Sequence, residues 1–220
     1  MHKQRKSPVS KVVFYTAISA LTLMTQISYG ASLDLSWNAN TETDLDGYNV
    51  YYGTAPGVYE DPIDVGDVTA YELSGLNEGV TYYVAITAYD TSDNESEKSD
   101  EENGTPPDTQ DPTVSITSPT SSSTYDTTSS TVSLGGSASD NVGVTTVTWS
   151  NSRGGSGTGS GTTSWSIGSV SLQSGSNIIT VTARDAAGNT GTDILTVTYT
   201  PPDMQNPTVT ITSPTSSSRN

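Results

Sequence analysis

The sequence lacks cysteine and contains very little histidine. Its 220 residues include one His, eight Lys and Arg, and 24 Asp and Glu, which gives a formal net charge of -16. Without Cys, the chain can form neither a disulfide framework nor a Cys nucleophile. The only His is His2, so removal of the N-terminus would also exclude a His general base, a Ser/His/Asp triad and a His-containing zinc site. Only carboxylate, tyrosine or lysine chemistry would remain.

Basic residues are equally scarce beyond the N-terminus. Four of the eight lie between Lys3 and Lys11, so residues 31–220 carry four basic residues against all 24 acidic ones. The four are Lys98, Arg153, Arg184 and Arg219. Such an acidic chain is not expected to bind nucleic acid or an anionic membrane.

The N-terminal 30 residues follow the pattern of a secretory signal peptide. A basic region is followed by the apolar stretch 12–27 and by the small residues Ser28 and Gly30. We therefore expect cleavage before Ala31 and a secreted or cell-surface protein that is not held in the membrane. A retained signal anchor is the alternative, although polar residues interrupt the short apolar stretch.

An internal repeat divides the remaining chain. Residues 105–123 and 200–218 are identical at 16 of 19 positions, at an offset of 95 residues that suits one β-sandwich. The charged, proline-containing run 100–108 is typical of a linker. We predict a first domain over 31–105, a linker over 106–110, and a second domain over 111–200. Residues 201–220 would be a linker and the first strand of a further, truncated repeat.

Strand patterns dominate both domains, and no helical stripe follows the signal segment. The candidate strands are 33–37, 48–52, 82–86, 144–149, 177–183 and 194–199. Turn residues separate them. The prediction is an all-β chain of two antiparallel β-sandwiches in tandem.

The first domain resembles a fibronectin type III module. The resemblance rests on Trp37, on Gly47–Gly53 (GYNVYYG), on Leu76–Tyr82 (LNEGVTY) and on the closing Gly104-Thr105-Pro106. Alternation would direct Tyr48 and Val50 inward, and the resemblance implies that the Tyr82 hydroxyl bonds to the backbone upstream.

The second domain is similar to bacterial immunoglobulin-like modules. The motifs are 111–119 (DPTVSITSP), 138–144 (ASDNVGV), 177–189 (NIITVTARDAAGN), and the residues Trp149 and Trp165. Without cysteines, the core must close by packing alone, and we expect both tryptophans to take part. The run 185–189 is expected to be a hairpin turn, and the Gly-rich run 154–161 a flexible loop.

Outward-facing tyrosines are the first candidate site. The alternation that buries Tyr48 and Tyr82 turns Tyr51 and Tyr83 outward, where aromatic rings could stack on a sugar. The competing interpretation is that tyrosine is simply a good strand former that shields cross-strand backbone.

Acidic loop residues are the second candidate site. Asp108 and Asp111 precede the second domain, and Asp140 and Asp185 lie in its loops. If these loops face the linker, the four carboxylates would lie close together and could bind calcium, which would stiffen the tandem. Alternatively, Asp140 and Asp185 form side-chain turns while Asp108 and Asp111 stay solvated.

Two other motifs do not carry a site. Asp44–Gly47 lacks the ligand ladder of an EF-hand, and 154–161 lacks the lysine of a phosphate-binding loop. No cofactor is expected apart from calcium.

These patterns favour a non-catalytic, extracellular modular protein or fragment. The resemblance implies a bacterial source and spacer, adhesion or polysaccharide-contact modules, with a polysaccharide or another cell-surface protein as partner. We expect the chain to be a monomer. The alternative is the accessory N-terminal region of a secreted polysaccharide-degrading hydrolase whose catalytic domain lies beyond residue 220.

Overall fold

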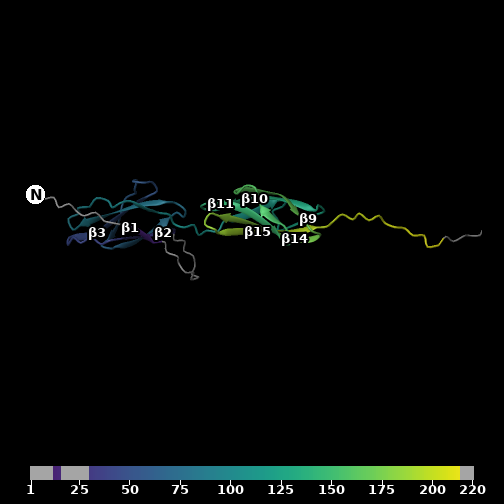
Figure 1. The fold of residues 1–220 in the computed structure, drawn as a ribbon, viewed down its shortest axis with the longest axis horizontal. Coiled ribbons are helices and arrows are strands. Elements are labelled where there is room, and N and C mark those ends of the chain that lie inside the picture. Colours follow the sequence, from purple (N-terminus) through teal and green to yellow (C-terminus); the bar gives the residue numbers. More distant parts are fainter. Residues whose placement is uncertain (1–11, 16–29, 214–220) are drawn as a thin grey trace, which may run out of the picture. The chain divides into compact units, whose positions relative to one another are not determined.

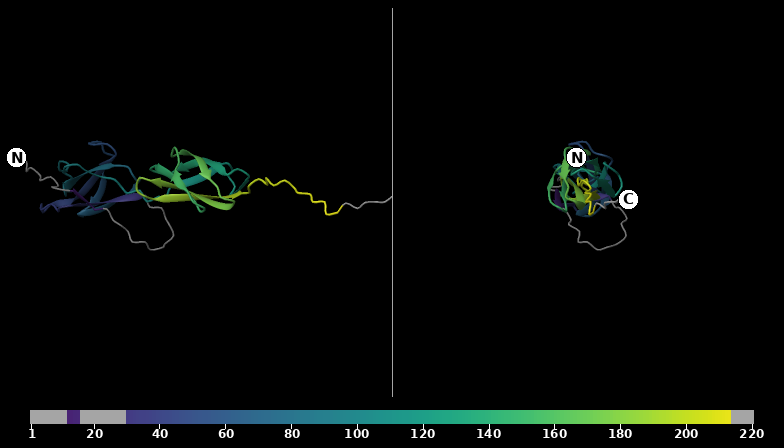
Figure 2. Two further views of the ribbon diagram at one scale, coloured as in Figure 1. Left: turned by 45° about the vertical axis from the view of Figure 1, so that its right-hand side comes forward. Right: turned by 90° about the vertical axis from the view of Figure 1, so that its right-hand side faces the viewer.

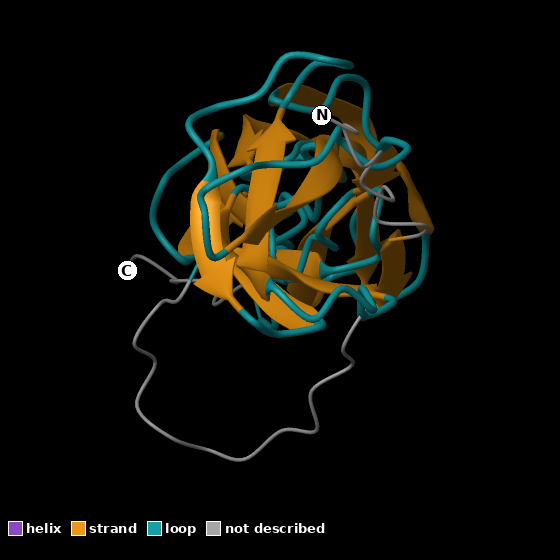
Figure 3. Cartoon of the chain, turned by 90° about the vertical axis from the view of Figure 1, so that its left-hand side faces the viewer, coloured by secondary structure: helices purple, strands orange, loops and turns teal. Residues whose placement is uncertain are grey.

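The computed structural model describes residues 12–15 and 30–213. These residues form fifteen strands joined by turns and loops, with no helix among them (Figures 1 and 3). They fall into two compact units. The first contains residues up to Asp111 with the loops Asp140–Gly143 and Ala186–Asn189, and the second contains Pro112–Ser139, Val144–Asp185 and the residues from Thr190 onward.

The first unit is built from two antiparallel sheets. One has the order β1-β2-β5 and the other the order β4-β3-β6-β7. The strands of the three-stranded sheet are β1 (Val12–Tyr15), β2 (Ala31–Trp37) and β5 (Ala70–Leu76). Those of the four-stranded sheet are β3 (Leu45–Gly53), β4 (Ile63–Gly66), β6 (Tyr82–Asp90) and β7 (Glu102–Gly104).

Alternating apolar side chains make the core of this unit. Tyr48 and Val50 are fully buried on β3, and Trp37 packs edge-on against Tyr48 with ring centroids 5.4 Å apart. Tyr82 is also buried, and its hydroxyl accepts a hydrogen bond of 3.0 Å from the backbone N–H of Asn77. Both the inward face and the corner expected from the sequence are therefore confirmed.

The second unit also contains two sheets. Their orders are β13-β10-β8 and β12-β11-β14-β15-β9, and only β9 runs parallel to its neighbour β15. The smaller sheet consists of β8 (Thr113–Ser118), β10 (Thr131–Ser139) and β13 (Ser164–Ser171). The larger consists of β9 (Thr124–Thr127), β11 (Val144–Asn151), β12 (Ser156–Thr158), β14 (Gly175–Asp185) and β15 (Thr190–Tyr199).

The two tryptophans of this unit differ in burial. Trp165 is 3% exposed and lies within the core, whereas Trp149 is only partly buried and packs against it. A side chain at Gly157 would lie 2.9 Å from the indole nitrogen of Trp149, so the glycines beside Trp149 leave room for its ring. The Gly-rich run is therefore not simply a flexible loop, since residues 156–158 form β12 and pair with β11.

Three other segments differ from or add to the sequence expectations. Val12–Tyr15 lies inside the expected signal peptide but forms β1, paired with residues 34–37 of β2. The rest of that segment, residues 1–11 and 16–29, lies outside the described residues. Glu102–Gly104, part of the run assigned to the linker, forms β7 at the edge of a sheet. Residues 201–213 form no strand, and residues 214–220 also lie outside the described part.

Residues 12–15 and 30–213 contain no helix that is long and apolar enough to span a membrane.

Candidate carboxylate site and tyrosine surface

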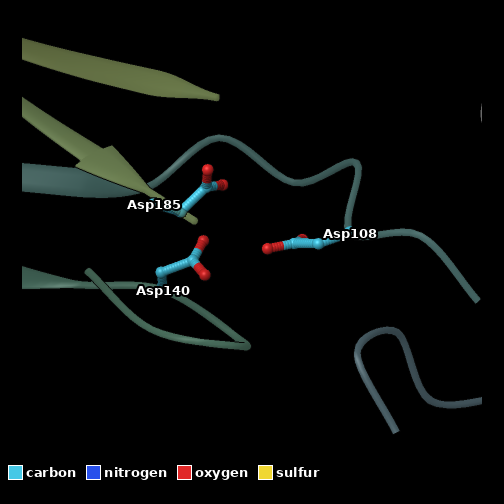
Figure 4. Close-up of side chains that lie close together, drawn as sticks. All are labelled: Asp108, Asp140 and Asp185. Carbon is cyan, nitrogen blue, oxygen red and sulfur yellow. The ribbon is translucent and has the colours of Figure 1, made fainter. Parts of the chain in front are cut away.

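Three of the four predicted aspartates come together, two in loops and the third, Asp185, at the end of a strand rather than in the expected loop. Asp108 precedes β8, Asp140 follows β10, and Asp185 is the last residue of β14. Each offers a carboxylate oxygen, and the three oxygens lie within 4.8 Å of one another (Figure 4). Asp111 is exposed and does not belong to this group. We call Asp108, Asp140 and Asp185 the carboxylate site.

Local hydrogen bonds fix the orientation of Asp140. Its Oδ2 accepts the backbone N–H groups of Val142 and Gly143, at 3.0 and 2.9 Å, as in an Asx turn. Its other oxygen, Oδ1, is buried and has no hydrogen-bond donor among the described residues. A turn role therefore accounts for only one of the two oxygens of Asp140.

Asp185 brings a buried charge to the same place. It is 3% exposed, at the end of a strand whose preceding alternate residues Val181 and Ala183 are fully buried. The hairpin expected over 185–189 is present, because β14 ends at Asp185 and β15 begins at Thr190. A carboxylate that is both buried and close to two others is costly unless a cation or donors compensate it.

The outward-facing Tyr51 and Tyr83, which together with Tyr59 we call the tyrosine surface, lie on the first unit. Tyr51 is half-buried on β3 opposite Ala85, and Tyr83 is half-buried two residues before Ala85 on β6. The outward orientation expected for the two side chains agrees with this register. The sequence analysis did not anticipate that the ring of Tyr51 makes an edge contact with Tyr59, with centroids 6.1 Å apart, or that Lys98 Nζ lies 3.8 Å from its centroid.

Two glutamates accept hydrogen bonds from the hydroxyl groups of Tyr51 and Tyr59. The Tyr51 hydroxyl donates to Glu95 at 2.7 Å, and the Tyr59 hydroxyl donates to Glu101. Burial, followed by the hydrogen bond and charge of Glu101, raises the pKa of Tyr59 to about 12. Burial alone would raise the pKa of Glu95, but hydrogen bonds from Thr87, Asn49 and Tyr51 outweigh it and lower that pKa. The segment 95–101 therefore covers part of the surface predicted for sugar stacking.

Sequence could not reveal this arrangement, because Tyr59 and Lys98 lie in irregular segments without period-2 alternation. The one usable signal was composition: Lys98 is the only basic residue between Ala31 and the linker.

Family models match most of the chain. One, described as a fibronectin type III domain, matches residues 17–104, and another, described as a bacterial Ig domain, matches residues 112–181. The chain contains a fibronectin type III domain followed by a bacterial Ig domain. The resemblance seen in the sequence and the predicted all-β fold class are thereby confirmed. The tyrosine surface belongs to the fibronectin type III domain, and Asp140 lies within the range matched as the bacterial Ig domain.

Individual relatives share limited parts of the chain. A Kelch domain-containing protein, SSO1033 of Saccharolobus solfataricus, is 37% identical over 67 residues, which are 29% of this chain and 9% of that protein. The chain thus spans less than a tenth of that relative's length.

Solved structures with related domains are more distant in sequence. A two-domain fibronectin type III segment of chicken tenascin is 16% identical, with a TM-score of 0.47, and the match covers 85% of this chain and 98% of that one. Fibronectin(III)-like modules of CbhA from Clostridium thermocellum are 14% identical, with a TM-score of 0.37, covering 91% and 100%.

Proposed function

We propose that this chain is an exported, non-catalytic modular protein whose two domains act as extracellular spacers and contact a polysaccharide or another cell-surface protein. The observation that carries the proposal is the combination of a fibronectin type III domain with a bacterial Ig domain, both of which are non-catalytic modules. The N-terminal export pattern and the strong acidic charge support a place outside the cell.

The competing function is an accessory region of a secreted polysaccharide-degrading hydrolase. The sequence that follows residue 220 in the gene distinguishes the two: further Ig-like repeats favour the spacer, and a carboxylate-bearing catalytic domain favours the hydrolase. Assays of residues 31–220 with soluble and insoluble polysaccharides test the non-catalytic role that both functions assign to these residues. Binding without release of reducing sugars supports contact modules, whereas turnover that one carboxylate substitution abolishes would contradict the non-catalytic role. Intact mass of the exported protein tests the cleavage before Ala31.

The tyrosine surface is the proposed position of polysaccharide contact. Tyr51 and Tyr83 offer aromatic area on neighbouring strands, outside the part of Tyr51 that Lys98 covers, and the edge contact with Tyr59 extends it. Retention of a folded Tyr51→Ala, Tyr83→Ala protein on insoluble polysaccharide should fall well below that of the parent. Tyr125→Ala, which changes a tyrosine of the other domain, is the matched control. Equal retention of the double variant would eliminate this surface.

We also propose that the carboxylate site binds calcium. Calcium lies about 2.3–2.6 Å from its oxygen ligands, so ligands on opposite sides of the ion are about 4.6–5.2 Å apart. Three oxygens within 4.8 Å can therefore share one calcium ion without rearrangement of the backbone. Magnesium, at about 2.0–2.1 Å, demands near-octahedral geometry and gives up its water ligands reluctantly. The buried Oδ1 of Asp140, which has no donor, supplies an oxygen already stripped of water.

Calorimetric unfolding tests the calcium proposal. Because calcium would bind only the folded state, 1 mM CaCl2 should raise the melting temperature of the chain relative to chelator, and 1 mM MgCl2 should raise it less. Asp140→Asn keeps an oxygen for the Asx turn but removes one charge. This variant should lose the response to calcium and should melt higher than the parent in chelator, because repulsion is relieved.

Asp126→Asn is the matched control, since Asp126 is an exposed carboxylate on β9, outside the carboxylate site. It should respond to calcium like the parent. An identical transition of the parent in calcium and in chelator would refute the site at millimolar concentrations.

A further inference from the structure

A small cavity of the first unit lies at the end of β3. Its volume is about 480 Å³, and it is lined by residues of β3, of β6 and of the loop 54–62 between β3 and β4, namely Tyr52, Gly53, Thr54, Glu60, Asp61 and Tyr82. Cavities of this volume are typical of sites for small ligands. None of these residues belongs to the tyrosine surface or to the carboxylate site, and we call this cavity the loop pocket.

Two tyrosine rings form one wall of the loop pocket. Tyr52 and Tyr82 lie on adjacent strands, with ring centroids 6.4 Å apart and ring planes inclined by 42°. Both contribute to the core that the first unit, drawn in purple to teal in Figure 2, encloses between its two sheets. Tyr82 is buried and Tyr52 is half-buried. The aromatic wall therefore continues the core, and its outer part reaches the pocket.

Backbone contacts hold the wall that the loop forms. The N–H of Glu60 donates to the carbonyl oxygen of Tyr52 at 2.9 Å, and the N–H of Val58 donates to that of Ala55 at 3.1 Å. A Cβ atom at Gly53 would overlap the carbonyl oxygen of Val58, so glycine at this position allows the loop to approach β3. The loop pocket is therefore formed before a ligand arrives, which lowers the entropic cost of binding.

The loop supplies two carboxylates to the pocket. Glu60 and Asp61 are exposed, and within the part of the chain that the structure describes neither side chain has a hydrogen-bond or ion-pair partner. Lys98 is the only basic residue of residues 31–105. It lies over the ring of Tyr51, and alternation along β3 directs Tyr51 and Tyr52 to opposite faces of the sheet. A positive charge for the two carboxylates can therefore come only from outside this unit.

The same unit already holds one ammonium group with a tyrosine and a glutamate. Nζ of Lys98 lies 3.8 Å from the ring centroid of Tyr51, whose hydroxyl donates a hydrogen bond to Glu95. The negative face of an aromatic ring attracts an ammonium group, and the attraction increases where water is excluded. The loop pocket combines the same kinds of group, tyrosine rings and carboxylates, but no lysine or arginine is among its lining residues.

A sugar fits the other features of the pocket better than the lysine side chain of a protein does. The tyrosine rings offer an apolar surface to one face of a sugar ring, while Thr54 and the carboxylates can form hydrogen bonds with its hydroxyl groups. A lysine side chain is narrow and would leave much of a cavity of about 480 Å³ unfilled.

We propose that the loop pocket binds a positively charged amino sugar of a polysaccharide. The sugar ring lies against Tyr52, and its ammonium group lies beside Glu60 and Asp61. The net charge of -16 favours the approach of such a cationic polymer. The inference rests on the proposed polysaccharide contact and narrows its ligand to a polysaccharide that carries amino groups.

Calorimetric titration of the complete chain 1–220 tests the requirement for charge. The probes are a linear glucosamine tetramer and the N-acetylated tetramer, which has the same rings and length but no charge. At about pH 5.5 the amines are protonated and exposed carboxylates are ionised, so the glucosamine tetramer should bind about tenfold more tightly. Equal affinity for the two tetramers, or no binding of the glucosamine tetramer, would overturn the proposal.

Two double variants separate a defined site from general attraction to an acidic chain. Glu60→Gln, Asp61→Asn removes both charges of the pocket and should weaken binding of the glucosamine tetramer about tenfold. Both residues are exposed, so folding is not at risk. The matched control is Asp67→Asn, Glu72→Gln, which removes two exposed carboxylates of the same unit outside the pocket and should bind like the parent. Equal weakening in the two variants would show that net charge alone attracts the sugar.

Amide signals in NMR spectra locate the bound sugar. The signals of Gly53 and Asp61 should shift during the titration, and that of Glu72 should stay in place. Shifts at Tyr51 and Tyr83 without shifts at Gly53 and Asp61 would place the sugar on the tyrosine surface and overturn the proposal. A short capped peptide with one lysine should bind more weakly than the tetramer, and equal affinity for the peptide would contradict the assignment to a sugar.

Failure of the loop pocket is distinguishable from failure of the proposed polysaccharide contact. If insoluble polysaccharide retains the parent but the glucosamine tetramer does not bind, the polysaccharide contact stands and the loop pocket is refuted. If Tyr51→Ala, Tyr83→Ala leaves retention unchanged while Glu60→Gln, Asp61→Asn still weakens tetramer binding, the tyrosine surface is eliminated and the loop pocket is supported.

Discussion

Gly136 shows how one residue without a side chain permits the second core. A Cβ atom at this position would overlap the backbone carbonyl oxygen of Ser115 and would lie 2.5 Å from Cζ2 of Trp165. Gly136→Ala must therefore displace either a neighbouring strand or the buried indole. We expect the free energy of unfolding of the second unit to fall by about 1–3 kcal/mol, measured by urea unfolding followed by circular dichroism.

Gly168 is the matched control for this substitution, because a Cβ atom there meets no other atom within 4 Å. Gly168→Ala is expected to be neutral or slightly stabilising, since alanine restricts the unfolded chain more than glycine does. Equal losses for the two variants would mean that the close approach at Gly136 does not determine stability.

Burial also separates the two tryptophans of the second unit. Trp165→Ala empties a site that is 3% exposed and should cost about 3–5 kcal/mol. Trp149 is only partly buried, so Trp149→Ala should cost less, about 1–2 kcal/mol. Urea unfolding of the two variants in parallel measures the two losses of unfolding free energy. A larger loss for Trp149→Ala than for Trp165→Ala would contradict the prediction that Trp165 is the core residue.

At the scale of elements, segment 95–101 is held against the first unit by its polar ends. Glu95 accepts hydrogen bonds from Asn49 on β3 and Thr87 on β6, and Glu101 accepts the backbone N–H of Gly57 as well as the Tyr59 hydroxyl. These bonds connect the segment to two strands and a loop. They also help to raise the pKa of Tyr51 and of Tyr59, which a titration can measure.

Tyr59 should ionise at about pH 12, mainly because burial disfavours the phenolate and then because Glu101 accepts its proton in a hydrogen bond. The pKa in the folded state is above the usual value of 10, so the contribution to stability is present below pH 10 and is lost as the pH rises toward 12. Absorbance titration at alkaline pH, with Tyr59→Phe as the reference, isolates this residue. Glu101→Gln should move its ionisation toward pH 10.

Glu97→Gln is the control, since Glu97 is an exposed carboxylate of the same segment. It should leave the ionisation of Tyr59 where it is. An unchanged titration in Glu101→Gln would show that burial alone sets this pKa.

The elements that could be predicted are those with apolar alternation. β2, β3, β6, β11, β14 and β15 each contain the strand expected for them, because one face of each is buried. The remaining strands were not among those expected. Glu102–Gly104 (β7) and Ser156–Thr158 (β12) contain no apolar side chain and depend on a neighbouring strand for their pairing, whereas β10 and β13 bury alternate apolar residues and were nevertheless missed.

The carboxylate site was partly predictable for a different reason. Asp140 and Asp185 stand beside turn residues at strand ends, which sequence can recognise. Whether Asp108 or Asp111 would join them could not be decided from sequence, because both lie in an irregular segment where side-chain direction has no period. The proximity of the three carboxylates is a property of tertiary structure alone.

At the scale of the whole molecule, stability resides in two separate cores. The buried apolar residues of the first core run from Leu33 to Ala88 and those of the second from Ile116 to Val197, with no residue in common. A loss in one core therefore has no direct path to the packing of the other. The Tyr48 contact of Trp37 and the Gly136 contact of Trp165 are each internal to one unit.

Trp37→Ala and Trp165→Ala should consequently each lower one melting transition and leave the other in place. Each substitution is expected to cost its own unit about 3–5 kcal/mol, and each kcal/mol shifts the melting temperature of a domain of this size by about 4–8 °C. Differential scanning calorimetry of the two variants and the parent resolves the transitions. If either substitution lowers both transitions equally, the two units unfold as one cooperative body, and mutational free energies must then be assigned to the whole chain rather than to a domain.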